Sequence, residues 1–119
     1  VHTGYDDWAV IGLQDTAGAL DIEDEEAGGG TQNDDVGITW ADGERRALKV
    51  CISSAGVPTF WYTAASPDNE EPAYIQATST NTGDALTAGD GMVPFLSFLI
   101  SGTDGPNVTI AWVEISYAP

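Results

Sequence analysis

The residues in this sequence that could do chemistry are mainly carboxylates, and many of them lie between Asp21 and Asp35. Asp21, Glu23, Asp34 and Asp35 would come together if the chain between them folded back on itself. Hard cations such as Ca²⁺ take about six to eight oxygen ligands, so a cluster of this kind could hold calcium. The stretch lacks the spaced Asp-x-Asp-x-Asp-Gly order of a calcium-binding loop, which favours a solvated acidic loop and leaves calcium binding as the alternative.

Other kinds of reactive site find no support in the sequence. His2, the only histidine, stands at the terminus, which argues against Ser-His-Asp triads, Cys-His dyads and His-rich zinc sites. Cys51, the only cysteine, lies in an apolar strand pattern and is expected to be a small buried side chain. Gly28–Gly30 leads into no helix and so does not predict a phosphate-binding loop. We therefore predict no catalytic residue, no metal, no cofactor and no enzymatic activity.

The net charge restricts the kind of partner that the protein can bind. The chain has 19 acidic residues against three basic ones, for a formal net charge of -16. This charge argues against binding to nucleic acid or to an anionic membrane, because both would be repelled. Such an excess of carboxylates is typical of proteins that face concentrated salt, where screening removes the self-repulsion, and the alternative is simply a very soluble acidic protein. The three basic residues are close together in the chain: Arg45, Arg46 and Lys49.

The last quarter of the chain has the strongest strand pattern. Residues 93–100 are almost entirely apolar, residues 108–117 are rich in β-branched and aromatic side chains, and residues 101–107 between them are turn formers. This pattern predicts a terminal β-hairpin whose first strand lies in the centre of a packed sheet.

Shorter strand patterns precede this hairpin, and no helical periodicity exceeds one turn. Asp42-Gly43 is a hairpin-turn dipeptide and is expected to pair the strands on either side of it. With the terminal hairpin, the patterns predict an all-β fold, an antiparallel jelly-roll-like β-sandwich of about eight strands. We expect a single domain over 1–119 with a flexible acidic loop near 24–35. The earlier predicted strands are 5–13, 19–23, 36–41, 46–53, 59–63 and 74–80.

Three adjacent aromatic residues, Phe60, Trp61 and Tyr62, cannot all face one core, because successive side chains of a strand point to opposite faces. At least one of them must lie outside the main core, either in an interface between subunits or in a platform for a sugar ring. The basic residues are the natural place for an acidic neighbour to bind. The predicted interface residues are Trp8, Arg45, Arg46, Lys49, Phe60, Trp61 and Tyr62.

Three segments near the end of the chain carry a resemblance to a known family. They are Asp84–Asp90 with the sequence DALTAGD, Ile100–Gly102 with ISG, and Val108–Glu114 with VTIAWVE. In this order they resemble the C-terminal half of small β-sandwich structural proteins of tailed viruses, which decorate or cement capsids. The acidic first half of the chain does not take part in the resemblance.

The resemblance implies a non-enzymatic structural protein on the virion surface, an outer capsid decoration or cement protein. Its partners would be the major capsid protein or another virion protein, together with further copies of itself, and the resemblance favours a trimer. The alternative is an exported, extracellular protein, either a carbohydrate-binding β-sandwich module or a filament subunit.

Overall fold

A computed structural model describes residues 7–13, 18–26, 29–41, 43–65, 73–83 and 85–87. The chain divides into two units, Val1–Gly89 and Asp90–Pro119, and every described residue belongs to the first. The predicted terminal hairpin of residues 93–100 and 108–117 lies outside the described residues. Among those that are described, no helix is long and apolar enough to span a bilayer.

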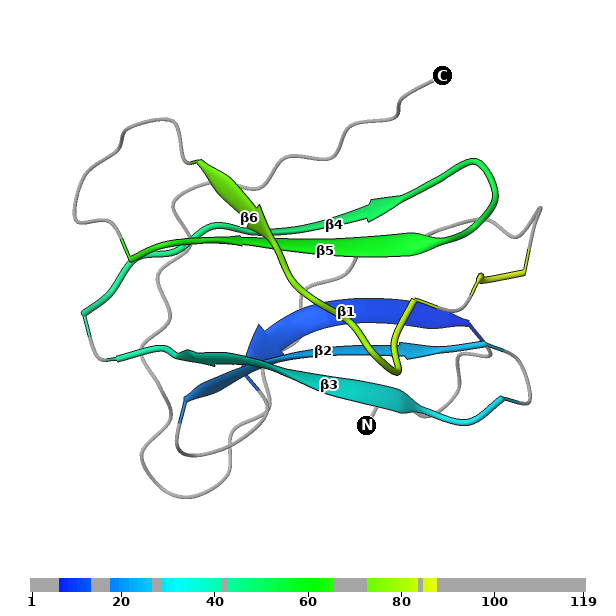
Figure 1. The fold of residues 1–119 in the computed structure, drawn as a ribbon, viewed down its shortest axis with the longest axis horizontal. Coiled ribbons are helices and arrows are strands. Elements are labelled where there is room, and N and C mark those ends of the chain that lie inside the picture. The colour runs from blue at the N-terminus through cyan, green and yellow to red at the C-terminus, as the bar shows by residue number, and fades with distance from the viewer. Residues whose placement is uncertain are drawn as a thin grey trace. The chain divides into compact units, whose positions relative to one another are not determined.

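The described part of the chain is all-β, without a helix, and its strands form two antiparallel sheets of three strands each (Figure 1). The first sheet has the order β1-β2-β3 and the second the order β4-β5-β6. The strands are β1 (Trp8–Leu13), β2 (Ala19–Glu25), β3 (Gln32–Thr39), β4 (Leu48–Ile52), β5 (Pro58–Thr63) and β6 (Tyr74–Gln76).

The first sheet is a meander in which β2 pairs with both neighbours, Ile22 lying opposite Ile11 of β1 and Asp34 of β3. The alternation of β2 explains its position, because Leu20, Ile22 and Asp24 are buried whereas the residues between them face away from the core.

The acidic stretch corrects the prediction of a long loop over residues 24–35. Strand β2 continues to Glu25 and β3 begins at Gln32, so the connection between them is short. The acidic residues fit into strands because alternation sends one set inward to polar partners and the other outward to water. Outward-facing Glu23 accepts a hydrogen bond from Asn33 Nδ2 at 3.2 Å, and Glu25 accepts one from Thr31 Oγ1 at 2.8 Å.

The dipeptide Asp42-Gly43 does not make the predicted hairpin. Strand β3 pairs with β2 and β4 pairs with β5, so the link between β3 and β4 carries the chain from one sheet to the other. The physical reason lies in the link itself, where the Trp40 indole Nε1 donates to the carbonyl of Glu44 at 3.0 Å and fixes a corner. The β4–β5 hairpin turns instead through residues 53–57, where Ser53 N–H donates to Val57 O at 3.0 Å.

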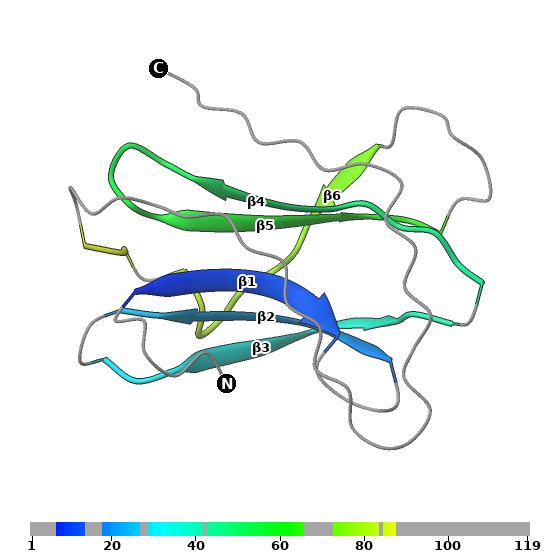
Figure 2. The ribbon, with the colours of Figure 1, turned by 180° about the vertical axis from the view of Figure 1, so that it is seen from behind.

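One hydrophobic cluster takes side chains from both sheets. Ile22 of β2, Phe60 of β5 and Ala77 after β6 are buried in it. Both views of the chain show that the segment after β6 leaves the second sheet and runs toward the first (Figures 1 and 2). The partly buried residues that pack against this cluster are Ala9, Ile11, Val36, Val50 and Tyr62.

Candidate interaction surface

The outer face of the second sheet places a lysine beside two aromatic side chains. Lys49 of β4 lies opposite Trp61 of β5, and Trp61 lies opposite Gln76 of β6. Tyr74 shares this face because it precedes Gln76 by two positions in the same strand. We call Lys49, Trp61 and Tyr74 the Lys49 face.

The ammonium group of Lys49 lies over two aromatic rings. Its Nζ is 6.0 Å from the centroid of Trp61 and 5.3 Å from that of Tyr74, so the side chain reaches from β4 across the central strand toward β6. Each such cation–π contact contributes about 0.5–1 kcal/mol at an exposed site. The Trp61 indole is itself oriented by a hydrogen bond from Nε1 to Thr59 Oγ1 at 3.2 Å. The arrangement therefore places a positive charge over two aromatic rings on the outer face of the sheet.

Lys49 makes no ion pair with a described carboxylate, although the chain has 19 acidic residues. Between two described residues the one ion pair joins Arg46 Nη2 to Glu44 Oε2 at 2.9 Å. The exposed charge of Lys49 is therefore available to a partner.

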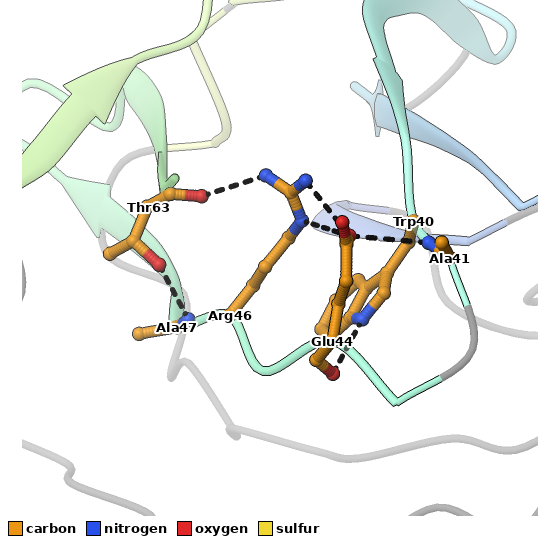
Figure 3. Close-up of polar contacts among 6 residues, drawn as sticks. All are labelled: Trp40, Ala41, Glu44, Arg46, Ala47 and Thr63. Carbon is orange, nitrogen blue, oxygen red and sulfur yellow. Dashed lines mark hydrogen bonds and ion pairs between the residues drawn. The ribbon is translucent and has the colours of Figure 1, made fainter. Parts of the chain in front are cut away.

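Arg46 was predicted as an interface residue, but its side chain is only 9% exposed and holds the link between the sheets (Figure 3). Its guanidinium contacts Glu44 Oε2 through Nε at 3.2 Å and Nη2 at 2.9 Å, and Nη1 donates to Thr63 O at 3.1 Å. The hydrogen bonds from Arg46, and then the one from the Ala41 N–H, lower the pKa of Glu44. Arg46 therefore stabilises the link between β3 and β4 by bonding to Glu44 and to the end of β5.

The remaining predicted interface residues differ in exposure. Trp8 and Phe60 are buried within the chain, 5% and 2% exposed, with Phe60 in the hydrophobic cluster and Trp8 opposite Glu25 on the other face of its sheet. Tyr62 is half-buried and packs against the hydrophobic cluster. Trp61, by contrast, lies on the opposite face from Phe60, which confirms that the aromatic run cannot all enter one core. Arg45 is exposed in the link that precedes β4.

A second polar site is built around Asp34, which points inward from β3 and is buried. Its carboxylate accepts hydrogen bonds from the backbone N–H groups of Thr80, Asn81 and Thr82 at 2.8, 2.8 and 2.9 Å. It also accepts hydrogen bonds from the side chains of the same three residues at 2.7, 2.9 and 3.0 Å. The neighbouring Asp24 accepts a hydrogen bond from Gly83 N–H through Oδ2. We call Asp34 and its three donor residues the Asp34 clamp.

Two opposing effects set the pKa of Asp34. Burial raises it, because a charge is costly away from water. The hydrogen bonds from Thr80, Asn81 and Thr82 outweigh burial, because they stabilise the ionised form, and they hold the pKa well below its ordinary value. The hydrogen bonds thus favour the ionised carboxylate, which serves as a structural acceptor for the Thr80–Thr82 segment.

Three of the four acidic residues proposed for calcium share the outward face of the first sheet, where Asp21 lies opposite Asp35 and Glu23 is two positions along β2. Asp34 instead faces inward, and its carboxylate is occupied by the clamp donors. In the described ranges, no group of three or more His, Cys, Asp or Glu side chains is arranged to hold a metal ion.

No family model matches the chain, and no curated protein or solved structure is significantly similar to it.

Sequence reasoning missed two members of these sites. The sequence does not predict that Tyr74 is a neighbour of Lys49, because their proximity depends on the β5–β6 register. Asp34 was noted as an acid but not as a clamp, because its donors are 46 to 48 positions away in the chain. The run Thr80-Asn81-Thr82, rich in short side chains that donate hydrogen bonds, was the available signal.

Proposed function

We propose that this chain is a non-enzymatic virion structural protein, an outer capsid decoration or cement protein, and that it assembles through the Lys49 face. The observation that carries the proposal is the exposed ammonium of Lys49 over Trp61 and Tyr74. Aromatic side chains are enriched in protein interfaces, and a cation that pairs with no described carboxylate of its own chain attracts an acidic neighbour.

The resemblance of residues 84–114 to capsid decoration proteins supports the viral part of the proposal. Two three-stranded sheets that share one hydrophobic cluster support a β-sandwich. The proposed complete fold adds the strands 93–100 and 108–117, for eight strands in a jelly-roll-like arrangement. The proposed partners are the major capsid protein or another virion protein and further copies of the chain, as a trimer on the virion surface.

The charge of the chain makes assembly dependent on salt. Copies that each carry a net charge of -16 repel one another over a long range at low salt. The screening length falls from about 10 Å at 0.1 M salt to about 3 Å at 1 M, which removes this repulsion while contacts within an interface are screened less. We therefore expect assembly to be favoured by high salt, in keeping with a saline environment.

Sedimentation across a salt series from about 0.05 to 2 M tests the proposal, because this range spans the change in screening length. The wild-type protein should pass from monomer to oligomer as salt rises. Trp61→Ser should remain monomeric, whereas the control Leu13→Ser, which removes a 49% exposed apolar side chain from the other sheet, should assemble normally. A wild-type protein that stays monomeric at every salt concentration overturns the proposal.

An exported carbohydrate-binding module is the second candidate function. Two aromatic rings on one sheet face, with exposed Gln76 beside them, are the elements of a sugar platform. The position of Lys49 over both rings disfavours this function, because a sugar would have to displace the ammonium. Quenching of the intrinsic tryptophan fluorescence by a panel of neutral glycans at low salt, where the chain is expected to be monomeric, would favour the module if it is lost in Trp61→Ser.

A further inference from the structure

We propose that the Lys49 face binds the outward carboxylates of β2 in a second copy of the same chain. These carboxylates are Asp21, Glu23 and Glu25, which we call the acidic row. This inference rests on the proposed function, because it names the partner surface for the assembly proposed above.

The acidic row is a suitable partner because of its regular spacing and its neighbours. Its members alternate along one strand, so their side chains repeat about every 6.8 Å on one face. Glu23 and Glu25 receive hydrogen bonds from Asn33 and Thr31, which are neutral. These donors orient the carboxylates and leave their negative charge uncompensated.

The Lys49 face and the acidic row carry charges of opposite sign and belong to different sheets of one molecule. Each copy therefore offers one surface of each kind, and the contact between copies is head-to-tail. Head-to-tail contacts give a closed ring if the rotation closes and an open filament if it does not. The proposed trimer would be a closed ring, whereas a filament subunit would form the open filament.

The energy of this contact has two parts. An exposed ion pair contributes only about 0–1 kcal/mol, so the charge of Lys49 mainly selects the partner surface and fixes its register. Burial of Trp61 and Tyr74 supplies the larger, salt-independent part, because aromatic side chains bury large apolar areas. Such an interface survives the salt concentration that removes the repulsion between whole molecules.

Two charge-reversal variants test the inference, Lys49→Glu and Glu23→Lys. Each alone places like charges across the proposed contact and should weaken assembly about tenfold or more at the lowest salt at which the wild type assembles. The double variant Lys49→Glu/Glu23→Lys keeps the formal net charge at -16 and should recover assembly, because at every contact the glutamate introduced at one position meets the lysine introduced at the other. Thermal unfolding of each variant checks that the fold is retained.

Glu23→Lys is an informative variant because its effect on net charge alone would favour assembly. This substitution changes the formal net charge from -16 to -14, because one negative group becomes positive, and would by itself reduce repulsion and promote assembly. The matched control Glu26→Lys makes the same change at an exposed residue outside the acidic row and should assemble at least as well as the wild type.

The possible results separate this inference from the proposed function. If Lys49→Glu fails to assemble while Glu23→Lys behaves like Glu26→Lys, the acidic row is not the partner and only the further inference is overturned. The same holds if the double variant does not recover assembly. If Lys49→Glu assembles like the wild type, the Lys49 face is not the interface and both proposals are overturned.

Discussion

Asp34 and Thr82 are 48 positions apart in the chain, yet the Asp34 carboxylate accepts both the backbone N–H and the hydroxyl of Thr82, at 2.9 and 3.0 Å. The contact joins β3 of the first sheet to the segment that leaves β6 of the second. The inward-facing carboxylate of Asp34 thus helps to hold the two sheets together.

Substitution of Asp34 should show the strength of this connection. Asp34→Asn removes the charge and places an amide donor among N–H donors, so the free energy of unfolding should fall by about 2–4 kcal/mol. Asp35→Asn is the matched control, because Asp35 is exposed and accepts one described hydrogen bond, from Gly37 N–H at 2.7 Å. Urea denaturation measures both variants, and equal losses would show that the clamp does not contribute as described.

The same residue predicts how stability depends on pH. An aspartate in an unfolded chain has a pKa of about 3.9, and the folded pKa of Asp34 is lower. The folded state therefore gains stability from the ionised group above the unfolded pKa and loses it as pH falls below that value. The stability difference between the wild type and Asp34→Asn should stay constant from about pH 7 to pH 5 and shrink below about pH 4. A difference that grows on acidification contradicts this assignment.

Gly18 should tolerate substitution less well than Gly30, although both have a positive φ, of 79° and 80°. A Cβ at Gly18 would lie 2.6 Å from the carbonyl oxygen of Trp40, whereas a Cβ at Gly30 would meet nothing within 4 Å. Gly18→Ala should therefore lower the midpoint of thermal unfolding more than Gly30→Ala, which reports the cost of the backbone conformation alone. Similar midpoints for the two variants would refute the close approach.

Phe60 and Trp61 are neighbours in β5, but truncation of Phe60 should lower the free energy of unfolding more than truncation of Trp61. Phe60→Ala empties a position in the shared cluster and should cost about 3–5 kcal/mol of unfolding free energy. Trp61→Ala removes a larger side chain from the outer face and should cost less than half as much in the monomer at low salt. Chemical denaturation at low protein concentration makes the comparison, and a larger loss for Trp61 would place it in the core.

The alternation of polar and apolar residues was sufficient to predict the six described strands, although not their bounds. It could not predict where β2 ends, because Asp24 is a charged residue on the buried face and resembles the start of a loop. The hydrogen bond from Gly83 N–H, 59 positions away in the chain, is a contact that helps to explain its burial. The sequence pattern does not contain that partnership.

Pairing between strands was harder to predict than the strands themselves. Asp42-Gly43 has the local chemistry of a hairpin turn, but Arg46 bonds to Thr63 at the far end of β5 and helps to turn the chain into another sheet. The Lys49 face was half predicted, since Lys49 and Trp61 were both named, but their proximity depends on the β4–β5 register. Local preference was therefore overruled by contacts that exist only in the folded molecule.

The Asp34 clamp also implies an order of folding. The meander β1–β2–β3 and the hairpin β4–β5 join strands that are close in sequence, so each can form early with a small loop-closure cost. The contact between Asp34 and Thr80 closes a loop over 46 positions and requires that both sheets already be in place. Interactions absent from the transition state act on the unfolding rate rather than the folding rate. We therefore expect the Asp34 carboxylate to slow unfolding and to have little effect on the folding rate.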